Sequence, residues 1–379
     1  MARTLLCPSC LHRFSASSIL FRCVLSDCIG QVPDEIYAIA HSTANAEMGR
    51  ILLLPRFRQH VPRLVSCDVC HRTSSTRICP CCHAILNYDA GSIDQYNIAV
   101  VGMRASGKTY YLASLISLLQ YETGKRFGFT IRMPDEKTRQ RWEHDFSFPL
   151  FVQKRMLQAT VSGQIHEPLI LRFTFASQEV RRTLNICFFE TMGEDMAVPA
   201  SRLNSQICLA DGLILLLDPL QITSIRQRVS AAVLPPLNPL AAPASVVARL
   251  RTLLEQELRL RGRQKVPVPV AFAFSKVDLL TPLLSPDSAM YHPSEHVGYL
   301  DLNNVQSVHT EIESYLASWM GPQFSRSLHE YFACYNYFGV SAFGEPPDGQ
   351  GSVISPLRVE DPFLWILYQL KLIPGMNRL

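Results

Sequence analysis

The segment that most constrains this chain is residues 102–109, a glycine-rich loop that ends in Gly-Lys-Thr. An apolar run at 96–101 precedes the loop and predicts a buried strand, and helical spacing continues from 109 to 121. A phosphate-binding loop needs this order of strand, loop and helix, because the backbone N–H groups of the loop then surround a phosphate at the helix N-terminus. The chain is therefore expected to contain a phosphate-loop nucleotide-binding fold.

The residue types within this loop predict individual contacts. Gly102 and Gly107 permit the tight turn, because glycine has no Cβ. Lys108 should reach the β- and γ-phosphates, and the hydroxyl of Thr109 should bind Mg²⁺. The predicted nucleotide-binding residues of the loop are Gly102, Ala105, Ser106, Gly107, Lys108, Thr109 and Tyr110.

A second motif predicts that the base is guanine. The tetrapeptide Ser-Lys-Val-Asp at 275–278 follows a predicted strand and resembles the Asn/Thr-Lys-x-Asp motif of GTPases. Asp278 could accept hydrogen bonds from the N1–H and the amino group of guanine, a pair of donors that adenine lacks, and the Lys276 stem could cover one face of the base. Ser341 and Ala342 resemble the Ser-Ala motif whose backbone N–H contacts the guanine oxygen.

A third motif concerns metal binding and hydrolysis. The pentapeptide Glu-Thr-Met-Gly-Glu at 190–194 resembles the Asp-x-x-Gly motif of Ras-like GTPases, so Glu190 is expected to hold Mg²⁺ together with Thr109. Glu194 stands where those proteins carry a water-orienting glutamine, and it could orient water or cap the following helix. Arg104 could reach the γ-phosphate as an internal arginine, or point to solvent or pair with Glu194. The predicted catalytic residues are Lys108, Arg104, Gly193, Glu194 and Thr160, with Thr130 as the alternative to Thr160 for closing on the γ-phosphate.

The rest of the chain beyond residue 90 alternates between strand and helix patterns. The predicted fold class is α/β: a P-loop GTPase domain over residues 91–379, with a mostly parallel sheet and helices on both faces. One pair of strands should be antiparallel, because only a short polar turn joins them. Strands are expected at 96–101, 169–175, 183–189, 212–217, 266–274 and 335–340, and helices near 109–121, 135–146, 246–260, 305–319 and 362–372; residues 234–243 should form an exposed loop and 281–303 an irregular insertion.

Residues 1–90 form a separate cysteine-rich head, which holds nine of the 12 cysteines. Because Cys-x-x-Cys pairs occur here without an export signal, they favour a metal over disulfides, and their spacing favours zinc over an iron–sulfur cluster. Two pairings stay open. Either Cys67, Cys70, Cys79 and Cys82 form one zinc site and Cys7, Cys10, Cys23 and Cys28 a second, or the two sites are interleaved; Cys81 is spare, and His12, His71 and His83 are expected at the surface or as substitute ligands.

Composition narrows the class of the protein. The net charge of +4 does not by itself imply nucleic acid, and the head carries arginines and acidic residues but no lysine, so we expect it to be a zinc-ribbon or treble-clef module that docks proteins. Zinc should contribute directly to the folding free energy of this module. No apolar run reaches about 18 residues, so we expect a cytoplasmic protein without membrane insertion.

The order of these motifs, together with the cysteine-rich head, resembles the bacterial double-GTPase family. The resemblance covers nearly the whole chain and implies a paired GTPase partner, a switch-like function and a bacterial multi-component conflict or defence system. Three other interpretations stay open. The chain could be a P-loop ATPase with Asp218 as its metal-binding acid, a nucleotide-bound scaffold with little turnover because Glu190 and Glu194 depart from the usual residues, or a zinc-dependent nucleic-acid binder.

Overall fold

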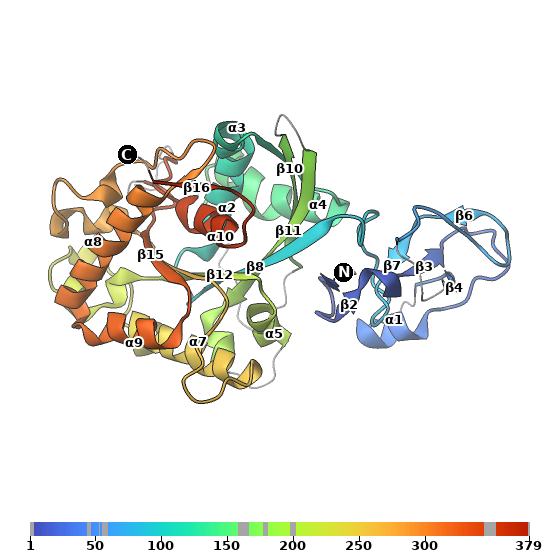
Figure 1. Cartoon of the computed structure of the whole chain (residues 1–379), viewed down its shortest axis with the longest axis horizontal. Coiled ribbons are helices and arrows are strands. Elements are labelled where there is room, and N and C mark those ends of the chain that lie inside the picture. Colours follow the sequence, from blue (N-terminus) through green and yellow to red (C-terminus); the bar gives the residue numbers. More distant parts are fainter. Residues whose placement is uncertain are drawn as a thin grey trace.

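The chain consists of a small head, residues 4–90, beside a larger main body, residues 94–377 (Figure 1). The head extends to one side, and the two parts meet at the first hairpin of the head. The computed structural model describes residues 4–43, 47–52, 54, 60–157, 167–176, 181–197, 202–344 and 354–377.

The main body is a mixed α/β fold with a largely parallel sheet, as the sequence predicts. β10 pairs antiparallel with both of its neighbours, while the other adjacent pairs are parallel. Within the described residues the sheet has seven strands, in the order β15 (Tyr335–Gly339), β13 (Val270–Phe274), β12 (Gly212–Leu217), β8 (Asp94–Gly102), β11 (Arg181–Met192), β10 (Leu169–Ala176) and β9 (Phe129–Arg132).

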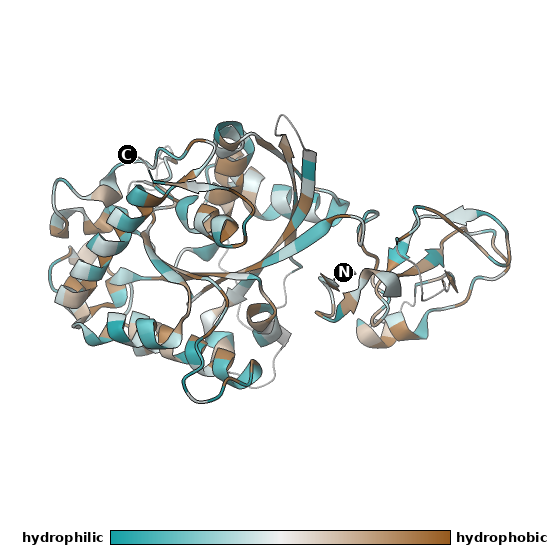
Figure 2. Cartoon of the chain, viewed as in Figure 1, coloured by the Kyte–Doolittle hydropathy of each residue, from teal (hydrophilic) through white to brown (hydrophobic). Residues whose placement is uncertain are grey.

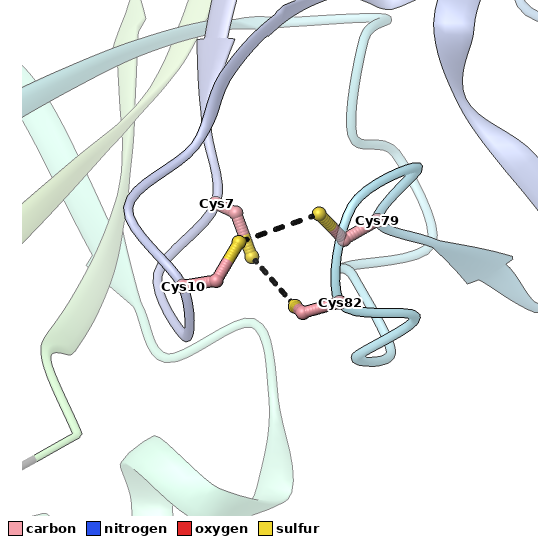
Figure 3. A group of neighbouring side chains, drawn as sticks. All are labelled: Cys7, Cys10, Cys79 and Cys82. Carbon is pink, nitrogen blue, oxygen red and sulfur yellow. Dashed lines mark hydrogen bonds between the residues drawn. The ribbon is translucent and has the colours of Figure 1, made fainter. Parts of the chain in front are cut away.

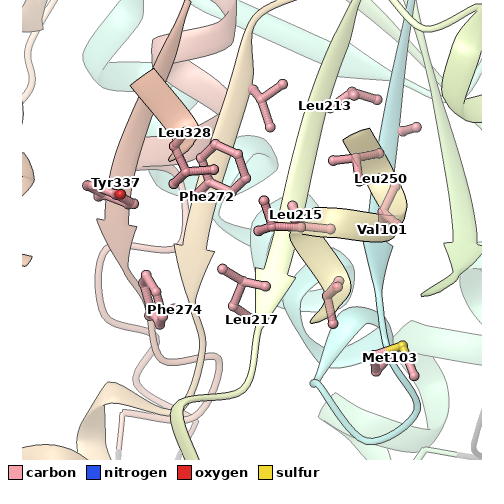
Figure 4. Close-up of a cluster of buried hydrophobic side chains, with 14 of the residues drawn as sticks. Val101, Met103, Leu213, Leu215, Leu217, Leu250, Phe272, Phe274, Leu328 and Tyr337 are labelled. Carbon is pink, nitrogen blue, oxygen red and sulfur yellow. The ribbon is translucent and has the colours of Figure 1, made fainter. Parts of the chain in front are cut away.

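The sheet separates two hydrophobic cores. Successive side chains of a strand point to opposite faces, so Leu213, Leu215 and Leu217 enter one core while Ile214 and Leu216 enter the other. Because β12 is buried on both faces, its sequence is continuously apolar rather than alternating. Figure 4 shows the first core, where Leu250 and Leu328 of two helices lie against the strands.

Helices cover both faces of the sheet and supply the remaining core side chains. Figure 2 shows hydrophobic and hydrophilic residues alternating along the outer helix α8, as expected for a helix with one buried side. The first core receives α5 (Arg202–Cys208), α7 (Pro243–Glu257), α8 (Leu302–Met320) and α9 (Gln323–Tyr331); the second receives α2 (Lys108–Leu118), α10 (Asp361–Gln369) and the π-helical segment η3 (Trp142–Val152) that continues α4 (Glu136–Arg141).

Most predicted elements are confirmed, with local corrections. The strand expected at 266–274 begins only at Val270, because Pro267 and Pro269 lack the N–H that a ladder requires. The expected helix at 135–146 turns π-helical after Arg141 and continues to Val152. The sequence interpretation missed β9, α5 and α9, and it missed the short elements η2 (Leu119–Thr123), α3 (Gly124–Phe127), α6 (Thr223–Arg226), η8 (Val277–Leu283), η9 (Ala289–Tyr291), β14 (Leu300–Asp301) and β16 (Gly375–Met376).

The head is made of short strands with little repetitive structure. Leu6 and Leu11 belong to the first core of the main body, and the side chains of Gln95 and Arg13 donate hydrogen bonds across the junction to the carbonyls of Leu6 and Leu209, both at 3.0 Å. Its elements are the hairpins β1 (Thr4–Leu6) with β2 (Arg13–Ser15) and β5 (Val65–Ser66) with β6 (Thr73–Ser74), the three strands β4 (Arg50–Leu52), β3 (Leu20–Cys23) and β7 (Arg77–Ile78), and α1 (Glu35–Ala40).

A buried charge network ties the head together. The guanidinium of Arg22 is fully buried and lies 2.5 Å from Asp34, whose carboxylate also contacts Nδ1 of His83 at 2.8 Å. Asp34 in addition caps α1 by accepting a hydrogen bond from the backbone N–H of Tyr37. His83 is therefore not a surface residue, and that expectation is wrong, whereas His12 and His71 are exposed.

No described helix is both long enough and apolar enough to cross a bilayer.

Arg22→Ala should destabilise the head strongly, because it leaves the buried carboxylate of Asp34 without its cation. We expect a loss of about 3 kcal/mol in the free energy of unfolding of the head. Arg50→Ala is the matched control, since its pair with Asp68 is exposed and should contribute less than about 1 kcal/mol. Urea denaturation, monitored by the release of bound metal to a chromogenic chelator, measures the free energy of unfolding of both variants. Equal losses of stability in the two variants would contradict the prediction.

Candidate nucleotide and metal sites

The predicted phosphate loop lies where the strand order of the sheet reverses. β8 sits between β11 and β12, and the loop leaves its carboxyl end, which is where ligands bind in open α/β sheets. A Cβ at Gly102 would lie 2.4 Å from Oγ of Ser106 and 3.0 Å from the carbonyl oxygen of Leu216, so only glycine fits. Gly107 has a left-handed φ of 89° directly before α2 begins. Both glycines therefore serve the turn that the sequence predicts.

Lys108 lies inside the loop. Its Nζ donates hydrogen bonds to the carbonyl oxygens of Gly102 at 2.6 Å and Met103 at 3.0 Å. Burial lowers the pKa of Lys108 to about 8, while the nearby carboxylates of Glu190 and Glu194 act in the opposite direction. The ammonium is therefore held in the concave side of the loop, beside the backbone groups expected to hold phosphate.

The structure also brings together the two residues predicted to hold Mg²⁺. Oγ1 of Thr109, at the start of α2, donates a hydrogen bond of 2.8 Å to Oε1 of Glu190, near the end of β11. A hydroxyl and a carboxylate are oxygen donors of the kind that Mg²⁺ prefers. The pair fits a magnesium site in which a protein hydroxyl and an acid lie beside the phosphates.

The segment after β11 packs directly on the phosphate loop. A Cβ at Gly193 would lie 2.7 Å from Sδ of Met103 and 3.3 Å from its backbone nitrogen, so a larger residue would fit only if these neighbours shift. Oε1 of Glu194 accepts a hydrogen bond of 2.8 Å from the backbone N–H of Arg104. The predicted contact between Glu194 and Arg104 thus involves the backbone, while the side chain of Arg104 is exposed and borders the cavity described next.

A cavity of about 610 Å³ connects the loop with both guanine motifs. Asp278 lies on its wall, and Nζ of Lys276 is 2.7 Å from Oδ2 of the buried Asp218. Asp218, the metal-binding acid in the ATPase interpretation, therefore forms an ion pair with Lys276 of the predicted guanine motif. Predicted residues that line the cavity are Arg104, Ala105, Gly107, Lys108, Thr109, Tyr110, Lys276, Asp278, Ser341 and Ala342.

Sequence reasoning missed part of the cavity wall. Tyr110 packs against Phe343 with ring centroids 4.8 Å apart, and its hydroxyl accepts a hydrogen bond from the backbone N–H of Leu157. Oγ of Ser114 in α2 donates to the carbonyl oxygen of Ala342 at 2.9 Å, which ties the second guanine motif to the phosphate-loop helix. Phe343 directly follows the Ser-Ala motif and could have been found from it. Leu157 comes from a distant segment that carries no motif.

The described residues place neither of the threonines predicted to close on the γ-phosphate at the cavity. Thr160 lies outside the described residues. Thr130, the alternative, is exposed in the edge strand β9, with β10 and β11 between it and β8, and it does not line the cavity.

The head contains two groups of four cysteines in the interleaved arrangement. One group is Cys7, Cys10, Cys79 and Cys82 (Figure 3), and the other is Cys23, Cys28, Cys67 and Cys70. Neighbouring sulfurs are 3.7 Å apart in the first group and 3.8 and 3.9 Å apart in the second. Zinc–sulfur bonds of about 2.3 Å in a tetrahedron separate sulfurs by roughly 3.8 Å, so both groups fit a zinc ion. Cys81 is exposed and belongs to neither group, as predicted.

Three of the cysteine pairs share one backbone turn. Leu11, His71 and His83 each follow the second cysteine of a Cys-x-x-Cys pair with a φ between 56° and 60°. Each of these residues donates its backbone N–H to the carbonyl oxygen of the first cysteine in the pair. The N–H of Cys70 also approaches the sulfur of Cys67, and backbone donors of this kind lower the pKa of Cys67 to about 7. In this pair the backbone donors therefore favour the thiolate form of Cys67, the form that binds a metal.

Comparison with known proteins agrees with this geometry. The Double-GTPase 2 family matches residues 97–329, a segment that begins in β8 and ends in α9. A protein of Mycolicibacterium smegmatis named "Putative ESX-1 scaffolding and assembly protein SaeC" is 25% identical over 392 residues, which cover 95% of this chain and 97% of the relative. Because the family match spans more than half of the sequence, the chain belongs to the Double-GTPase 2 family.

Proposed function

We propose that this protein binds GTP in the 610 Å³ cavity, hydrolyses it, and uses the head to dock partner proteins as a molecular switch. The observation that carries the proposal is that one cavity is lined by the phosphate loop, by Asp278 and by Ser341 and Ala342. We divide the chain accordingly into a zinc-binding module over residues 1–90 and a nucleotide-binding domain over 91–379.

Each end of the cavity has its own proposed chemistry. Lys108 and the backbone of the loop bind the phosphates, and the carboxylate of Asp278 accepts the two hydrogen bonds of guanine. Thr109 and Glu190 would hold Mg²⁺, which when bound neutralises charge between the β- and γ-phosphates. Gly193 would contact the γ-phosphate, and the packing of its segment against the loop supports this role.

The head supports a role in protein docking. α1 has no buried residue, and Ile36 and Ile39 on this helix are exposed. Large apolar side chains exposed close together mark interaction surfaces more often than isolated ones do. The relative named for scaffolding and assembly supports protein partners, whereas a paired GTPase and a conflict or defence system remain predictions from the family resemblance. The exposed apolar residues of the head are Val24, Ile29, Val32, Ile36, Ile39, Met48, Leu64, Ile85 and Tyr88.

A nucleotide-bound scaffold with little turnover is the second candidate. Glu194 already binds the loop backbone, and a carboxylate near a phosphate is repelled by it, which disfavours the water-orienting role of a glutamine. The name of the relative also favours a scaffold. An ATPase is less favoured, because Asp218 is engaged by Lys276.

Asp278→Asn should change the preferred base from guanine to xanthine. The amide retains one acceptor but replaces the other with a donor, and xanthine carries an oxygen where guanine carries its amino group. Titration with fluorescent GTP, XTP and ATP analogues should show that the variant binds GTP at least about tenfold more weakly than the wild type and binds XTP more tightly. The affinity for GTP falls because polar groups in the site are left unpaired. Unchanged GTP affinity, or tighter binding of ATP than GTP by the wild type, would overturn the assignment of the base.

Arg104→Ala tests hydrolysis separately from binding. If the exposed guanidinium reaches the γ-phosphate, its loss should slow single-turnover GTP hydrolysis at least about 100-fold, because arginines in this role raise the hydrolysis rate by a factor of about 10³–10⁵. GTP affinity, measured in parallel, should change far less. An unchanged hydrolysis rate would remove Arg104 from the catalytic residues, and a wild type without turnover would favour the scaffold.

Two zinc ions per chain are expected in the purified protein. Cys79→Ser should lower the zinc content to one per chain, because each four-cysteine group would hold its ion independently. Cys81→Ser is the control and should retain two, since Cys81 belongs to neither group. Elemental analysis by mass spectrometry measures the content; iron in place of zinc, or two ions in the Cys79 variant, would contradict the assignment.

A further inference from the structure

Arg141 approaches the proposed magnesium site from a segment that no motif marks. Its guanidinium lies 3.4 Å from Oε2 of Glu190, while Oε1 of the same carboxylate accepts the hydrogen bond from Thr109. Only 14% of the Arg141 side chain is exposed, and its guanidinium also packs over the ring of Phe146. The carboxylate of Glu190 is thus shared between the phosphate-loop helix and the end of α4.

The same arginine lines a second cavity, of about 530 Å³, where the head faces the main body. The residues that line it include Tyr37 and His41 of the head, and Lys137 and Arg141 of α4. α4 is only six residues long, and the backbone N–H of Ile170 in β10 donates a hydrogen bond to Oγ1 of its Thr138. Arg141 therefore extends from the cleft beside the head to the metal end of the nucleotide site.

We propose that Arg141 is a positioning residue that weakens Mg²⁺ binding at Glu190 and links it to the cleft beside the head. This inference rests on the proposed function. A guanidinium beside a carboxylate neutralises part of its charge and repels a divalent cation, and the effect is large where water is partly excluded. Binding linkage is reciprocal, so a change at the cleft that moves Arg141 changes metal affinity, and metal binding changes the cleft.

Removing this charge should strengthen metal binding. Mg²⁺ is expected to slow the release of fluorescent GDP, and the assay measures the Mg²⁺ concentration that gives half of this effect. For Arg141→Gln we expect this concentration to fall about tenfold, because the variant removes a positive charge that lies within a few ångströms of the metal site. Arg141→Lys keeps the charge and should stay near the wild type. Arg139→Gln is the matched control, because Arg139 lies on the same helix, is exposed and pairs with Glu136.

The result that overturns the inference is an unchanged or higher Mg²⁺ requirement in Arg141→Gln while GDP binding persists. A wild type that binds no GDP would instead overturn the proposed function itself. Should the glutamine variant fail to fold, Arg141→Met tests the same loss of charge with its apolar stem kept against Phe146.

Hydrogen–deuterium exchange tests the link to the cleft without measuring turnover. In the GDP-bound wild type, saturating Mg²⁺ should change exchange over residues 134–141 and 84–88, two segments that contribute lining residues to the cleft. In Arg141→Gln the Mg²⁺-dependent change over these residues should be lost, and in Arg139→Gln it should remain. Identical Mg²⁺ responses in the wild type and Arg141→Gln, or no response in either, would show that Arg141 does not connect the two regions.

Discussion

The parallel pairing of β8 with β11 is the constraint on which the site depends. In this register Glu190 lies opposite Val100 and Met192 opposite Gly102, so the segment after β11 emerges beside the phosphate loop. The hydrogen bond from Thr109 to Glu190 and the packing of Gly193 on Met103 both follow from that alignment. A shift of one residue would turn Glu190 to the other face of the sheet and remove it from the helix that carries Thr109.

Motifs that act through adjacent residues could be predicted from the sequence, whereas contacts between distant segments could not. The loop and Asp278 were found because a few consecutive residues carry their chemistry. Arg141 was missed, since a cation in an amphipathic helix is usually a solvated residue and only the tertiary fold places it beside Glu190. Which cysteine pairs share a metal site could not be predicted for the same reason. Three similar Cys-x-x-Cys turns carry no information about which pairs meet.

The head combines a small hydrophobic core with two four-cysteine groups that could hold metal and with a buried charge network. Its buried cluster combines cysteines with a few larger apolar side chains such as Phe14 and Phe21. Arg22, Asp34 and His83 add a buried ionic network, which is costly to desolvate and is compensated only when every partner is in place. The head also exposes large apolar residues such as Ile36 and Ile39, which the proposed docking role would use.

In the proposed nucleotide cycle, Glu190 and Glu194 would act at different steps. Glu190 keeps a carboxylate where the related motif has one, and its contact with Thr109 preserves the metal end of the site. Glu194 replaces an amide with a charge and is already bonded to the backbone of the loop. A γ-phosphate close to that carboxylate would be repelled by it. GTP binding would therefore disfavour the observed position of the segment after β11. In the proposed function, the repulsion that would slow hydrolysis would also make this segment respond to GTP, and a switch requires that response more than it requires a high rate.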